Sequence, residues 1–272
     1  MKYNFICKDL YNEYNSLGDI TNSLKKYISK NINLLNDIYF KPKKIEIEKI
    51  DEIITNDGYI QLIEQTIKNI SIINIEEVIK NIIKELETTL KIEESEEEIF
   101  IIFGFHTTTI YSTEYQKKNV TVLLLESTLG LEENIKMLLA HEYTHWIRKK
   151  TFCHDIFESC IGERFVTEGI ACNFSEKMVP NKKESYYCTV PQKTVNWVNQ
   201  NMKIIDGLVK ESLDSNKGMY NFFYMFAKTI PDNMPVRTGY VYGYLKVKKY
   251  LKENNKKVEN IIKIRWEDIL HK

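Results

Sequence analysis

The segment His141-Glu142-Tyr143-Thr144-His145 constrains this chain more than any other stretch. Two histidines four residues apart lie on one face of an α-helix, where both imidazoles can reach one metal ion. Glu142 directly follows the first histidine, so its carboxylate can lie beside a water molecule on that ion and accept a proton. With 5 His among 272 residues, this spacing should arise by chance in about 1% of such chains. The pattern predicts a zinc site on a helix.

The surrounding residues predict a long, buried helix from Leu131 to Lys150. Glu132 and Glu133 suit the positive end of its dipole, and three basic residues suit the other end. Apolar residues cover nearly the whole circumference, which is typical of a buried helix. Buried histidines need partners, and the spacing indicates a metal ion. The alternative is two core histidines bound to backbone carbonyls, with Glu142 in an ion pair.

Composition restricts the class of protein. A content of 43% hydrophobic and 28% charged residues is ordinary for a soluble globular chain of one or two domains. The formal net charge of zero provides no long-range field for nucleic acid or anionic lipid. No apolar run is long enough to span a membrane, and the N-terminus lacks a secretory h-region. Five cysteines without a C-x-x-C pair indicate reduced thiols. We expect a cytoplasmic enzyme with neither a nucleic-acid nor a membrane partner. Its oligomeric state stays open.

The chain divides into two regions with different patterns. Residues 1–92 carry apolar residues at helical spacing, and the acidic run Glu93–Glu98 then indicates a solvated connector. The short apolar segments Ile99–Phe105 and Asn119–Leu125 predict strands just before the motif helix. We therefore predict a mainly helical N-terminal region, 1–92, followed by a catalytic region, 93–272, with an α+β fold built on a small sheet.

A catalytic zinc ion needs a third protein ligand and one open position. Arg148 and Thr151 occupy the places where the extended pattern H-E-x-x-H-x-x-G-x-x-H would need glycine and histidine, so that class is excluded. An acid on the next predicted helix, Ile156–Met178, remains. Glu163 and Glu168 both have apolar neighbours on their helical faces, where a carboxylate needs a partner. Helical facing therefore leaves both acids as candidates.

The segment Glu168-Gly169-Ile170-Ala171 resembles the E-G-x-A signature of gluzincin metallopeptidases, the group that includes thermolysin-like enzymes and zinc aminopeptidases. In those aminopeptidases the acid of this signature is the third zinc ligand, so the resemblance implies that role for Glu168. The interval between His145 and Glu168 is a little longer than in the aminopeptidase pattern. Gly169 and Ala171 would also let this helix approach the motif helix closely.

A closer resemblance is to a bacterial family of predicted zinc-dependent proteases, carried as a domain of unknown function and typified by YjaZ-like proteins. Its members combine H-E-x-x-H, a downstream E-G-x-A and a late segment rich in tyrosine and glycine, here Pro235–Tyr244. The resemblance covers roughly residues 95–255. It implies a zincin-like catalytic region, one zinc ion per chain and a peptide or protein substrate.

The late segment has two interpretations. Gly239 and Gly243 form a small-residue face that can pack a helix closely against a neighbour. Alternatively, a tyrosine hydroxyl or the Arg237 guanidinium donates a hydrogen bond to the oxyanion of the reaction, as zinc peptidases require. Among these donors we select Tyr240.

These observations predict a zinc-dependent peptidase. His141, His145 and Glu168 hold the ion with water in the fourth position, and Glu142 is the general base. The alternative is a catalytically inactive or structural zinc protein that acts as a helical interaction module. A structural site would be closed by a fourth ligand such as Cys153, Cys172 or His154. A zinc hydrolase that acts on a non-peptide bond is a third reading.

Overall fold

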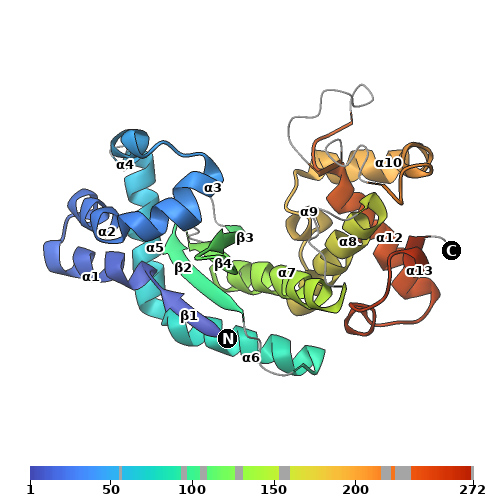
Figure 1. The fold of residues 1–272 in the computed structure, drawn as a ribbon, viewed down its shortest axis with the longest axis horizontal. Coiled ribbons are helices and arrows are strands. Elements are labelled where there is room, and N and C mark those ends of the chain that lie inside the picture. Colours follow the sequence, from blue (N-terminus) through green and yellow to red (C-terminus); the bar gives the residue numbers. More distant parts are fainter. Residues whose placement is uncertain are drawn as a thin grey trace. The chain divides into compact units, whose positions relative to one another are not determined.

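A computed structural model of the chain describes residues 1–54, 57–92, 97–104, 109–125, 131–152, 160–215, 222–223 and 234–270. The chain forms two compact units, residues 1–135 and 136–272 (Figure 1). The predicted division into regions 1–92 and 93–272 is a different one, because it marks where the catalytic region is expected to begin. That division stays a prediction. No helix within the described ranges is sufficiently long and apolar to cross a bilayer.

A small mixed sheet lies in the first unit. Its strands are β1 (Lys2–Phe5), β2 (Glu98–Phe103), β3 (Thr109–Tyr115) and β4 (Lys118–Leu125), labelled in Figure 1, and their order in the sheet is β1-β2-β4-β3. β1 and β4 both pair in parallel with β2, whereas β3 pairs antiparallel with β4. The last five residues of β2 are all buried, as expected for a continuous apolar run inside a parallel arrangement.

The two predicted strands are confirmed as β2 and β4, and the sequence reading missed β1 and β3. Glu98, expected to end a solvated connector, opens β2 and accepts hydrogen bonds from Lys2 Nζ at 2.6 Å and Asn4 Nδ2 at 2.8 Å. Residues 93–96 of that acidic run lie outside the described residues.

Helices make up most of the rest of the first unit, as predicted for residues 1–92. They are α1 (Cys7–Leu17), α2 (Ile20–Leu35), α3 (Lys41–Lys43), α4 (Ile50–Ile54), α5 (Asp57–Ile73) and α6 (Ile75–Leu90), with a π-helical turn at Asn36–Phe40 and a 3-10 turn at Ile47–Lys49. Among the described residues, the fold is therefore α+β with a small four-stranded sheet.

The second unit is helical in its described part. The motif helix α7 (Leu131–Phe152) begins before the boundary and continues into this unit. It is followed by α8 (Ile161–Met178), α9 (Glu184–Tyr187), α10 (Gln192–Val209), α12 (Thr238–Glu253), a 3-10 turn at Val258–Asn260 and α13 (Glu267–Leu270). The structure thus has a helix over the predicted range Leu131–Lys150, extended by two residues.

The start of α8 differs from the prediction. It begins at Ile161 rather than Ile156, because Cys160 has extended backbone angles (φ −70°, ψ 165°). The Cys160 sulfur accepts a hydrogen bond from the Glu163 N–H at 3.4 Å, which satisfies one of the amide groups left open in a first helical turn. Residues 153–159 lie outside the described part of the chain.

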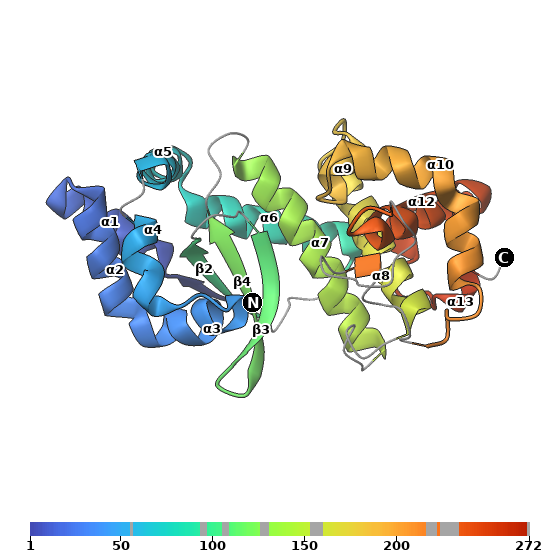
Figure 2. The same ribbon diagram turned by 90° about the horizontal axis from the view of Figure 1, so that it is seen from above.

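Glycines bring α8 and α12 into backbone contact (Figures 1 and 2). A Cβ atom at Gly169 would overlap the Gly243 carbonyl, and one at Gly243 would overlap the Phe165 carbonyl. Asn173 Nδ2 also bridges the helices by donating to the carbonyls of Gly169, at 2.8 Å, and Tyr244, at 3.0 Å. The glycine-packing interpretation of the late segment is therefore confirmed. The expectation that Gly169 faces the motif helix is wrong, because Gly169 faces α12.

Two glycine-to-alanine changes test this crossing. Gly243→Ala should lower the free energy of unfolding by about 1–3 kcal/mol, because the new methyl group forces two backbones apart. Gly207→Ala is the matched control, since a methyl group at that exposed helical position would meet nothing within 4 Å. It should raise stability by about 0.5–1 kcal/mol through helix propensity. Urea unfolding followed by circular dichroism measures both, and a stabilising Gly243→Ala would contradict the contact.

Candidate metal centre

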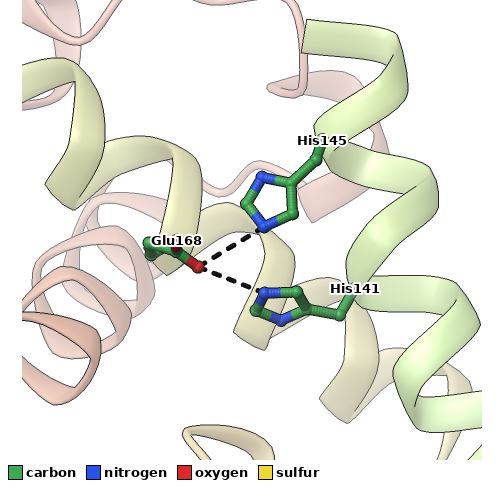
Figure 3. A group of neighbouring side chains, drawn as sticks. All are labelled: His141, His145 and Glu168. Carbon is green, nitrogen blue, oxygen red and sulfur yellow. Dashed lines mark hydrogen bonds and ion pairs between the residues drawn. The ribbon is translucent and has the colours of Figure 1, made fainter. Parts of the chain in front are cut away.

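Three side chains from two helices converge on one point (Figure 3). His141 and His145 project from α7, and Glu168 projects from α8. The His141 Nε2 atom lies 3.1 Å from Glu168 Oε2, and the His145 Nε2 atom lies 3.4 Å from the same oxygen. The ligand atoms of the three residues all lie within 4.8 Å of one another. The structure thus brings together the three residues predicted as metal ligands.

The donor set and its spacing fit a zinc ion. Two imidazole nitrogens and one carboxylate oxygen are typical ligands of catalytic zinc, with bonds of about 2.0–2.1 Å. Such bonds in a tetrahedron place neighbouring ligand atoms about 3.3 Å apart. The distances of 3.1 and 3.4 Å from Glu168 Oε2 to the two imidazoles match this edge. Both distances from Glu168 to the histidines thus already have the length that a bound zinc ion would require.

Charge in the interior makes a cation favourable at this point. Burial raises the pKa of Glu168, but the Arg164 charge and the two histidines outweigh it and hold that pKa well below its usual range. Burial lowers the pKa of His141, yet hydrogen bonds to Cys172 and Glu168 raise it to about 9. For His145, the attraction of Glu168 likewise outweighs burial and raises the pKa. The buried Glu168 carboxylate is stabilised by positive charge beside it. A metal ion bound to the two neutral imidazoles would supply that charge.

Glu142 and Tyr240 lie in the surroundings of this group. Glu142 is buried on α7, with 7% of its surface exposed, and its charge contributes to the raised pKa of His145. Tyr240 is in the first turn of α12 and half-buried. Burial raises the pKa of Tyr240, and the nearby Glu168 carboxylate raises it further, while Arg164 opposes both effects. The Tyr240 hydroxyl is therefore electrostatically coupled to the predicted third ligand.

Arg237, the other donor considered for the oxyanion, is engaged elsewhere. Its guanidinium donates to the Thr189 carbonyl and to Thr189 Oγ1, both at 2.9 Å. The same group lies 4.3 Å from the centre of the Tyr240 ring, within cation–π range. Arg237 thus orients Tyr240 and the chain around Thr189.

Glu163, the competing candidate for third ligand, is occupied by an arginine. Arg148 Nη2 lies 2.5 Å from Glu163 Oε1, and the Thr167 hydroxyl donates to the same oxygen at 2.8 Å. Both charged side chains are buried. The structure therefore groups Glu168, and not Glu163, with the two histidines.

Cys172 lies next to His141, on the side of the imidazole ring that faces away from Glu168. Its sulfur lies 4.0 Å from His141 Nδ1, the ring nitrogen opposite the one that faces Glu168. From there it supports the ring rather than closing the site as a fourth ligand, and such outer partners orient metal-binding histidines. Cys153 and His154, the other two candidates for a closing ligand, lie outside the described residues.

The sequence reading overlooked Arg164. This residue is 5% exposed on α8, and its Nη2 atom lies 2.8 Å from Glu168 Oε1. The signal was present in the sequence, since Arg164 precedes Glu168 by four residues and such pairs meet on a helix surface.

A group of two half-buried histidines and one buried carboxylate, with a buried glutamate next to His141 in the sequence, defines a candidate hydrolytic zinc centre. Comparison with known families agrees with this class. The family described as Predicted Zn-dependent protease (DUF2268) matches residues 75–271, and the chain belongs to this family. The family prediction is thereby confirmed, and the match includes every residue of the site. No curated protein and no solved structure matches the chain.

Proposed function

We propose that this chain is a zinc-dependent peptidase whose ion is held by His141, His145 and Glu168. The convergence of two Nε2 atoms on one Glu168 oxygen carries the proposal. When bound, a zinc ion activates a water molecule and polarises the carbonyl of a peptide or protein substrate. The family description, predicted Zn-dependent protease, supports the same reaction class.

Glu142 acts as the general base in this proposal. Two observations support this role: Glu142 directly follows His141 in the sequence, and its charge contributes to the raised pKa of His145. It accepts a proton from the attacking water and delivers that proton to the nitrogen of the leaving amine. Both transfers need one carboxylate within hydrogen-bond reach of the reacting atoms.

Tyr240 is the proposed donor to the oxyanion that forms on the substrate carbonyl. Its hydroxyl is coupled electrostatically to Glu168 and Arg164. The raised pKa keeps this phenol protonated at neutral pH, which is the form that can donate. The cation–π contact with Arg237 and the start of α12 at Thr238 fix the ring in place.

Zinc content of untagged protein tests the metal centre. Wild type should contain one zinc ion per chain, and Glu168→Gln should lose or greatly weaken its binding because the amide is a poorer ligand. Glu163→Gln is the matched control on the same helix, and it should keep zinc because Glu163 pairs with Arg148. Atomic emission or a chromophoric chelator gives the stoichiometry. Absence of zinc from freshly purified and zinc-supplemented wild type would remove the proposal. Zinc binding without hydrolysis in a broad peptide screen would favour the interaction module.

A further inference from the structure

We propose that Arg164 is a positioning residue of the metal centre, which restricts Glu168 to ligation through a single carboxylate oxygen. This inference rests on the proposed zinc site and goes beyond it, because it assigns the coordination mode of the third ligand. The ion pair between Arg164 and Glu168 is the observation from which it starts.

The two oxygens of Glu168 have different partners. Oε2 faces His141 and His145 at 3.1 and 3.4 Å, whereas Oε1 lies 2.8 Å from Arg164 Nη2. A charge-assisted bond of this length is among the stronger hydrogen bonds in proteins. The Arg164 and Glu168 side chains are 6% and 3% exposed, so water screens the pair weakly.

This division disfavours ligation through both oxygens. A carboxylate that turned Oε1 toward the ion would withdraw it from the Arg164 guanidinium. Breaking a buried ion pair from one side is strongly destabilising, so this rotation of the carboxylate is disfavoured. Glu168 therefore offers Oε2 alone, and three protein atoms leave the fourth position open for water or substrate.

Arg164 also contacts an aromatic ring. Its guanidinium lies 5.2 Å from the centre of the Phe223 ring, within cation–π range. Its positive charge lowers the pKa of the Tyr240 phenol, against the larger raising effect of burial. The same guanidinium therefore interacts electrostatically with both the proposed third ligand and the proposed oxyanion donor.

The visible spectrum of the cobalt-substituted protein tests the coordination mode without measuring activity. Wild type should show the intense absorption of a four-coordinate ion. Arg164→Met frees Glu168 Oε1, so absorption per cobalt should fall by roughly half as the ion passes from four to five ligands. Arg164→Lys keeps a charge that can hold Oε1 and should retain most of the wild-type intensity. Arg265→Met, a change at an exposed arginine outside the metal group, should leave the spectrum unchanged.

The outcomes separate this inference from the proposed function. Equal cobalt content with an unchanged spectrum in Arg164→Met would overturn the role of Arg164 and leave the zinc site intact. Wild type that binds neither cobalt nor zinc would overturn both. If circular dichroism shows that Arg164→Met does not fold, Arg164→Leu gives the same readout, because it also removes the donor to Glu168 Oε1.

Discussion

Replacing Glu142 by glutamine should leave zinc content unchanged and lower peptide hydrolysis by about 10²–10⁴-fold. The amide has nearly the shape of the carboxylate but cannot accept a proton, so the variant removes the proposed general base alone. The proposed ligands His141, His145 and Glu168 should keep their mutual geometry, because the distances among them do not involve Glu142. The expected effect therefore falls on kcat rather than on metal binding.

Glu132→Gln is the matched control for this substitution. Glu132 lies on the same helix, is exposed, and is not part of the metal group. Its variant should keep both zinc and activity within about twofold, as is usual for surface changes of this size. The measurement is turnover of a fluorogenic peptide, with zinc content determined on the same samples. Substantial residual activity in Glu142→Gln would refute the role of Glu142.

The two histidines of the candidate metal centre could be predicted from the sequence because their spacing is a local feature. The spacing of His141 and His145 fixes one helical face, and that face needs no knowledge of the rest of the fold. The third ligand required more, because Glu163 and Glu168 both have apolar neighbours on α8. The resemblance to gluzincins favoured Glu168. In the structure Glu163 differs from Glu168 because it forms an ion pair with Arg148 of α7.

Other features depend on contacts between distant segments, which local patterns do not encode. β1 pairs with β2 although Lys2 and Glu98 are far apart in the chain. β3 has a mixed, largely polar pattern because it pairs on one side only, at the edge of the sheet. Gly169 indicated that another helix packs closely against α8, but only the fold shows that this helix is α12. A small residue in a helix thus predicts a close helix contact without identifying the helix that makes it.

Replacing Arg148 by methionine should lower the free energy of unfolding by about 3–5 kcal/mol, the usual cost of breaking a buried ion pair from one side. Arg148 is 2% exposed and joins three parts of the second unit. It bonds Glu163 Oε1 at 2.5 Å, Thr167 Oγ1 at 2.7 Å, and the carbonyls of Ile262 and Ile264 at 2.7 and 3.0 Å. Without the guanidinium, the Glu163 carboxylate stays buried with only a hydroxyl donor.

The double variant Arg148→Met/Glu163→Met separates the charge from the other contacts. Removing both partners eliminates the unpaired carboxylate, so it should recover part of the lost stability, although the two carbonyls still lack their donor. Lys149→Met, an exposed neighbour on α7, should change stability by no more than about 0.5 kcal/mol. Urea unfolding of the four proteins measures these differences. A double variant less stable than Arg148→Met would mean that Glu163 stabilises the fold independently of Arg148. In that case the arginine serves mainly to hold the C-terminal segment through the Ile262 and Ile264 carbonyls.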